Sequence, residues 1–145
     1  MSTLRRGNTQ YAALPYRRGA DGLEILLITS RGTGRWIIPK GWPIAGLSPG
    51  QSAAREAYEE AGVTGNIGAE SLGTYGYDKR LADDTSQYCD VEVFALEVTE
   101  QRAKWPERHE RQREWLSIEQ AIERISEAEV RPLIRTLREQ LAAQR

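Results

Sequence analysis

Three glutamates gather near the end of one predicted helix. The stretch REAYEEAG, residues 55–62, places Glu56, Glu59 and Glu60 within two turns, just before Gly62, which is expected to end the helix. Like charges at this spacing repel by roughly 0.2–0.5 kcal/mol per pair. Anions in the last turn also oppose the helix dipole, by roughly 0.3–1 kcal/mol each. Such a cluster indicates either a captured cation or a solvated helix face.

The glutamates lie beside a stripe of small side chains. At about 100° per residue they span an arc of roughly 100°, and alanines flank that arc at positions 53, 54, 57 and 61. The stripe predicts close packing on a sheet, which would hold the carboxylates at a packed seam. Hard oxygen donors held in this way suit Mg²⁺ or Mn²⁺. The alternative is a solvated face on which Arg55 pairs with Glu59.

The whole chain has the composition of an ordinary globular protein. Its 145 residues predict one domain over 1–145, with residues 1–9 as a loose N-terminal arm. The net charge of −1 gives no global basic field, so no extended nucleic-acid surface is expected. No apolar run is long enough for a membrane span. The single cysteine, Cys89, cannot form an internal disulfide, which favours a cytoplasmic location.

The sequence predicts an α/β fold. Strands are expected within 10–18, 23–30 and 35–42, the last interrupted by Pro39 and Gly41. Ser48 should cap a helix that runs to about Ala61, with Gln51 closing a capping box. Further strand-like segments are 71–80, 87–100 and the first part of 111–125. The last two predicted helices follow Ser117 and fill 129–144, and the hairpins argue against a purely parallel sheet.

Residues 41–63, GWPIAGLSPGQSAAREAYEEAGV, resemble the Nudix box. That motif is a glycine, five residues, a glutamate, seven residues and then R-E-aliphatic-X-E-E-X-G-aliphatic. The matching positions are Gly41, Arg55, Glu56, Ala57, Glu59, Glu60, Gly62 and Val63. The resemblance implies an α/β/α sandwich around a mixed central sheet. It also implies metal-dependent hydrolysis of a diphosphate joined to another group.

The same resemblance assigns roles to the acidic cluster. Glu56, Glu59 and Glu60 are expected to bind Mg²⁺ or Mn²⁺ with help from the main chain at Gly41, and Arg55 is expected to orient one of them. Leu47 stands where the motif has its first glutamate. We expect the three ligand glutamates to form a working site that lacks this supporting carboxylate. The alternative is a family member that has lost catalysis.

About residues 10–125 are similar to the branch that contains diphosphoinositol polyphosphate phosphohydrolases and diadenosine polyphosphate hydrolases. RWIIPKGW before the box and REWLSIEQAI after it carry this similarity. It implies phosphate contacts by a set of polar and basic residues, each of which is otherwise an ordinary surface side chain. These are Arg17, Arg18, Thr29, Ser30, Arg31, Arg35 and Lys40. Lys79 and Arg80 either extend the patch or lie in a solvated turn, and Gln112 replaces a frequent basic residue of that branch.

Hydrolysis of a phosphoanhydride also needs a proton acceptor. Glu56 is one candidate, and Glu107, His109 and Glu110 in the following loop are others. Trp42, Tyr75 and Tyr77 either stack on a base or pack in the core. One cysteine and one histidine do not make a zinc site, and no nucleophile elbow, P-loop or dinucleotide fingerprint is present.

These observations predict a metal-dependent Nudix pyrophosphohydrolase. The expected partner is a small polyphosphorylated substrate, either a diadenosine polyphosphate or a diphosphoinositol polyphosphate. An enzyme that removes oxidised nucleoside triphosphates and a non-catalytic Nudix-fold binding module are the alternatives. The oligomeric state is left open.

Overall fold

Eight strands form one mixed sheet in the computed structural model, which describes residues 8–144. In chain order the elements are β1 (Thr9–Gly19), β2 (Gly22–Thr29), β3 (Trp36–Ile37), β4 (Lys40–Gly41), α1 (Pro49–Ala61), β5 (Val63–Ile67), β6 (Gly73–Arg80), β7 (Ser86–Gln101), β8 (Arg113–Ser117), α2 (Ile118–Arg124), the 3₁₀ turn η1 (Ala128–Val130) and α3 (Arg131–Ala143). The main strand order is β3-β2-β1-β7-β5, with β4 paired to β1, β6 to β7 and β8 to β2. The pairing of β1 with β7 is parallel and the other pairings are antiparallel, so the predicted mixed sheet is confirmed.

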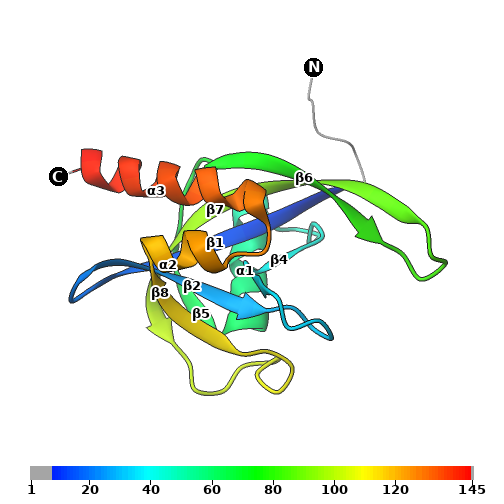
Figure 1. Cartoon of the computed structure of the whole chain (residues 1–145), viewed down its shortest axis with the longest axis horizontal. Coiled ribbons are helices and arrows are strands. Elements are labelled where there is room, and N and C mark those ends of the chain that lie inside the picture. The colour runs from blue at the N-terminus through cyan, green and yellow to red at the C-terminus, as the bar shows by residue number, and fades with distance from the viewer. Residues whose placement is uncertain (1–7, 145) are drawn as a thin grey trace.

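Helices cover both faces of this sheet (Figure 1). Successive residues of β1 and β2 are buried on opposite faces because side chains alternate along a strand. Leu14 and Ile25 pack under α2 and α3 in one core cluster, whereas Ala13 and Leu26 pack under α1 in a second cluster. The layers are therefore α/β/α, as predicted.

Helix α1 begins and ends as its sequence predicts. Ser48 accepts a hydrogen bond from the backbone of Gln51, whose side chain accepts one from the backbone of Ser48. Gly62 adopts the left-handed conformation at φ 70° and ends the helix. Ala53, Ala57 and Ala61 are fully buried, so α1 approaches the sheet closely and its position is set by packing.

Some predicted boundaries differ from the structure. The segment 35–42 is two short strands on different partners, because Pro39 interrupts it and its carbonyl accepts a hydrogen bond from Ala13 of β1. Strand β5 was not predicted: its glycine and asparagine weaken the strand signal, and it forms by pairing with the end of β7. Thr9 already belongs to β1, so the predicted arm is wrong at this residue, and residues 1–7 lie outside the described residues. Within 8–144, no helix is long and apolar enough to cross a membrane.

Candidate functional site

The acidic end of α1 faces strand β4. Glu60 is only 6% exposed, and its Oε1 accepts a hydrogen bond from the backbone N of Lys40 at 3.4 Å. The Glu56 carboxylate lies directly against Gly41: a Cβ atom at that position would be 2.6 Å from Glu56 Oε2 and 2.8 Å from Oε1. Glycine is therefore required at position 41 for Glu56 to keep its place.

The ionised forms of Glu56 and Glu60 are disfavoured in the folded chain. Burial raises the pKa of Glu60 to about 8, assisted by its hydrogen bond to Glu56 and by the Glu56 charge, while Arg111 acts in the opposite direction. Burial also raises the pKa of Glu56, and the charges of Glu59 and Glu107 add to the shift. Ionisation of both carboxyl groups together is therefore unfavourable, and a cation bound between their oxygens would lower both pKa values.

Glu59 is directed elsewhere. Its Oε1 lies 3.5 Å from Arg55 Nε, and the two side chains are 36% and 57% exposed. Across residues 8–144, no three acidic, histidine or cysteine side chains are grouped closely enough to hold a metal ion. The structure thus brings Glu56, Glu60 and Gly41 together, with Glu59 paired to Arg55 beside them. The full predicted ligand set stays a prediction.

A loop after β7 closes the C-terminal end of α1. Trp105 Nε1 donates to the carbonyl of Glu60 at 3.1 Å, and the backbone N of Glu107 donates to the carbonyl of Glu59 at 3.1 Å. From the start of β8, the Arg113 guanidinium donates to the carbonyl of Ala61 at 2.9 Å. These donors satisfy carbonyls that a helix end leaves unpaired, and they fix the loop against the acidic end of α1.

Arg111 is a site residue that the sequence did not reveal. Its side chain is 7% exposed, with Nε 2.9 Å from Glu107 Oε1 and a terminal nitrogen 3.8 Å from Glu60 Oε1. It also donates to the carbonyl of Thr29 at 3.0 Å. In the sequence it is one arginine among several in a charged loop, and the only available signal was the concentration of acidic and basic residues in ERHER. Its buried position depends on the docking of that loop.

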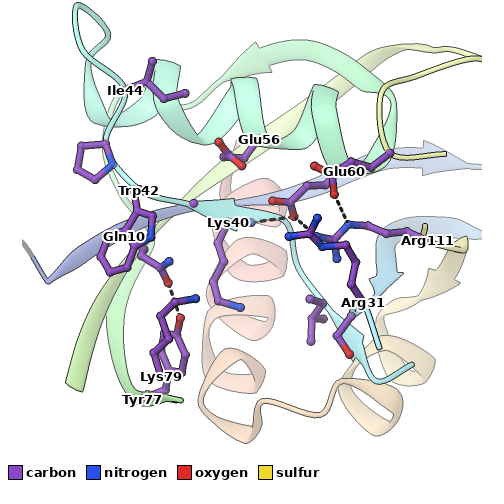
Figure 2. A pocket seen from close by; sticks show the side chains of 15 residues that line it. Gln10, Arg31, Lys40, Trp42, Ile44, Glu56, Glu60, Tyr77, Lys79 and Arg111 are labelled. Atoms are coloured by element: carbon purple, nitrogen blue, oxygen red, sulfur yellow. Dashed lines mark hydrogen bonds and ion pairs between the residues drawn. The ribbon is translucent and has the colours of Figure 1, made fainter. Parts of the chain in front are cut away.

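The acidic pair opens into a polar cavity of about 630 Å³ (Figure 2). Figure 2 shows Glu56 and Glu60 pointing into it from α1, with Arg31 and Arg111 on one side and Trp42 and Lys79 on the other. Three carboxylates and four cations line the cavity: Glu56, Glu60, Glu107, Arg31, Lys40, Lys79 and Arg111. The cavity thus offers carboxylates and cations side by side, and Arg111 lies directly between the carboxylates of Glu60 and Glu107.

The structure divides the predicted phosphate-binding residues into two groups. Ser30, Arg31 and Lys40 line the cavity, and Lys79 joins them. Arg17 and Arg18 do not: Arg17 lies six residues along β1 from Tyr11, the partner of Gly41, or roughly 20 Å away. Arg17 instead pairs with Glu24 at 2.7 Å.

Two other basic residues also lie outside the cavity lining. Arg35 is exposed and holds the 30–35 loop through its backbone contacts with Ser30. Arg80 is exposed at the end of β6, 3.7 Å from Asp84.

Some of the candidate proton acceptors and aromatic residues line the cavity, and the others lie outside it. Glu107 lines the cavity together with Glu56, whereas His109 and Glu110 are exposed in the outer part of the loop. Trp42 is 38% exposed and Tyr75 only 6%, so Trp42 faces the cavity and Tyr75 belongs to the core. Tyr77 lines the cavity, and its hydroxyl donates to Gln10 Oε1 at 2.5 Å.

Leu47 occupies the position where the resembling motif has its first glutamate. It is 40% exposed and closes a turn through its backbone N, which donates to the carbonyl of Ile44. The same loop is tied to α1 by Ser52, whose buried hydroxyl accepts a hydrogen bond from the backbone N of Ile44 at 3.2 Å. Ser52 therefore links the loop to the helix in this chain without a carboxylate at position 47.

Comparison with known proteins identifies the family. The NUDIX domain family matches residues 9–137. "Nudix hydrolase 21, chloroplastic" of Arabidopsis thaliana is 38% identical over 83% of this chain and 63% of its own length. "Diphosphoinositol polyphosphate phosphohydrolase 3-beta" of Homo sapiens is 35% identical over 77% of this chain and 65% of its own length.

Solved structures agree with this assignment. A C. elegans Ap4A hydrolase in a binary complex matches with a TM-score of 0.70 and 27% identity, over 93% of this chain and 98% of that one. The chain spans about half to two thirds of the length of the first curated relatives that it matches. The family match, the identities and the box at Gly41–Val63 lead to one conclusion: this chain belongs to the Nudix hydrolase family.

Proposed function

We propose that this chain hydrolyses a phosphoanhydride bond in a small polyphosphorylated molecule with the help of Mg²⁺ or Mn²⁺. The observation that carries the proposal is the Glu56–Glu60 pair against Gly41, at the edge of a cavity that also holds four cations. Nudix domains generally use divalent metal ions. The residues present fit such an ion, because the carboxylates are hard oxygen donors and Gly41 leaves them room beside the main chain.

Glu56 and Glu60 would hold the ion, with Glu59 added after release from Arg55. The chemistry that the ion would supply there is neutralisation of charge on the diphosphate oxygens. Arg31, Lys40 and Lys79 would bind the remaining phosphate oxygens, since they line the cavity beyond the acidic pair. Glu56 and Glu107 would be the candidates to accept the proton of the attacking water, since both line the cavity.

The exposed face of Trp42 favours a nucleotide-linked substrate. An aromatic ring that is 38% exposed in a polar cavity offers a plane on which a base can stack. The nitrogen of Lys79 lies 5.9 Å from the centre of that ring, so a base on Trp42 would have a phosphate-binding cation beside it. A diadenosine polyphosphate therefore leads, and a diphosphoinositol polyphosphate is second.

Two further functions are tested by the same assay. One is hydrolysis of oxidised nucleoside triphosphates. The other is binding without turnover, for which the observation is Leu47, since the box carboxylate expected there is absent. A cytoplasmic location belongs to the proposal as well, supported by the free, buried thiol of Cys89.

The test is a substrate panel. Diadenosine tetraphosphate, diphosphoinositol pentakisphosphate and oxidised and ordinary nucleoside triphosphates are incubated with the protein and Mg²⁺ or Mn²⁺, and products are separated by ion-exchange chromatography. Glu59→Gln and Glu60→Gln should each lower kcat/KM by about 10²-fold or more. The matched control is Glu123→Gln, an exposed carboxylate on α2, which should leave turnover unchanged. Metal-independent ligand binding without any product would instead identify a binding module.

A further inference from the structure

Lys40 is held at the cavity wall by a carboxylate from another part of the chain. Its Nζ lies 3.5 Å from Glu127 Oε2, and the two side chains are 15% and 16% exposed. The same nitrogen lies 5.2 Å from the centre of the Tyr77 ring. Lys40 belongs to β4, whereas Glu127 precedes η1, which leads into α3. Figure 2 shows the Lys40 side chain directed away from Glu56 and Glu60.

Glu127 is itself held firmly. Its Oε2 accepts a hydrogen bond from the Tyr75 hydroxyl at 2.7 Å. Tyr75 is 6% exposed, and burial together with the Glu127 charge keeps the pKa of this hydroxyl well above its usual value, so it stays a donor. The carbonyl of Glu127 also accepts from the backbone N of Val130. The carboxylate therefore has a fixed position from which it can place Lys40.

Packing does not account for a carboxylate here. Glu127 Oε1 is buried, and across residues 8–144 it has no hydrogen-bond partner. An apolar side chain would fill the same space without a buried oxygen that lacks a donor. The charge of Glu127 therefore needs another explanation, and its charged neighbour is Lys40.

We propose that Glu127, oriented by Tyr75, is a positioning residue that holds the Lys40 ammonium where the cavity receives a phosphate group of the ligand. A lysine has four flexible carbons, and fixing its ammonium in advance removes ordering entropy from ligand binding. The inference rests on the proposed function in one respect, that the ligand carries phosphate.

The test measures binding without turnover. Methylenediphosphonate, a diphosphate analogue that cannot be hydrolysed at its bridge, is titrated by calorimetry into the protein in Mg²⁺ buffer. Glu127→Gln and Lys40→Met should each weaken binding by about tenfold, and the double variant should bind no more weakly than Lys40→Met alone. The matched control is Glu129→Gln, an exposed carboxylate two residues away, which should bind as the wild type does.

Each other result decides against the inference. Wild-type or tighter binding by Glu127→Gln, losses that add in the double variant, or no binding by the wild type would each overturn it. If Glu127→Gln fails to fold, Tyr75→Phe replaces it in the test. Loss of the Tyr75 hydroxyl should weaken binding when Lys40 is present and should have no further effect in the Lys40→Met background.

The two proposals can fail separately. Coupled binding by Lys40 and Glu127 in a chain that hydrolyses nothing would refute the enzyme and leave the positioning role. Turnover of a substrate together with unchanged binding by Glu127→Gln would do the reverse.

Discussion

Replacing Gly41 by alanine tests the position of Glu56 directly. The new Cβ would lie 2.6 Å from Glu56 Oε2 and closer still to its Cδ, whereas such contacts become ordinary only at 3.4 Å, so the carboxylate must retreat by about 1 Å. Because it is the far end of a flexible side chain, it can move at little cost to folding. A displacement of this size in a reacting assembly costs on the order of 10²-fold in rate, or about 2.7 kcal/mol of transition-state stabilisation.

The assay compares kcat/KM on the best substrate of the panel with the melting temperature of the same variant. Gly41→Ala should lose about 10²-fold in kcat/KM while its melting temperature stays within a few degrees of the wild type. The matched control is Gly50→Ala in α1, where the new Cβ would meet its neighbours at 3.5–3.7 Å, in ordinary contact. That variant should keep its activity and its melting temperature, since Gly50 is the second residue of α1 and alanine there gains less than the roughly 0.5–1 kcal/mol of a helix interior.

The reasoning would be refuted by a Gly41→Ala variant that retains more than about a third of the wild-type kcat/KM. In that case the reaction would not depend on the observed place of Glu56. Equal losses in both glycine variants would point to a general disturbance of the loop and of α1.

Three further predictions follow from the same contacts. In EDTA, the free energy of unfolding should fall as pH rises from about 5 to 9. Glu60 has a pKa of about 8 in the folded chain, against an ordinary value of 4.5. The protonated carboxyl group therefore stabilises the folded chain fully below the ordinary pKa, and this contribution is lost as the pH rises through the folded pKa. In urea titrations Glu60→Gln should remove a few kcal/mol of this pH dependence (about 1.36 kcal/mol per pKa unit), and an unchanged slope would contradict the shift. Arg111→Met should lower the unfolding free energy by about 2 kcal/mol, measured by urea denaturation at pH 7, because the Glu107 carboxylate and the Thr29 carbonyl lose the donor that Arg111 supplies. Ser48→Ala should cost about 1 kcal/mol through the lost cap and leave KM unchanged, and a large change in KM would show that the cap also shapes the site.

The chain's local signals were enough to locate helix α1. Its capping residues lie within four positions of the helix start, and its alanine stripe repeats at the helical period, so a short window contains all the necessary information. The main strands followed from runs of apolar residues in the same way. Strand β5 did not, because it is weak by itself and exists through its pairing with β7.

The grouping of the glutamates on one face of α1 could be predicted, but the surroundings of each carboxylate could not. Spacing along a helix fixes which glutamates share a face. Whether Glu60 is buried, or whether Glu59 turns to Arg55, depends on what packs against that face. The basic residues illustrate the same limit, since Arg31 lines the cavity while Arg17, on a predicted strand, is held at its far end by Glu24.

By itself, the sequence determined the elements, the family motif and the acidic helix face, because each of these depends on residues a few positions apart. The tertiary structure alone decided that the Glu56 carboxylate contacts Gly41 and that two ion pairs form, Arg111 with Glu60 and Lys40 with Glu127. These contacts join residues about 15 to 90 positions apart in the sequence. They are set by sheet register and loop docking, and neither is written in any short stretch of the chain.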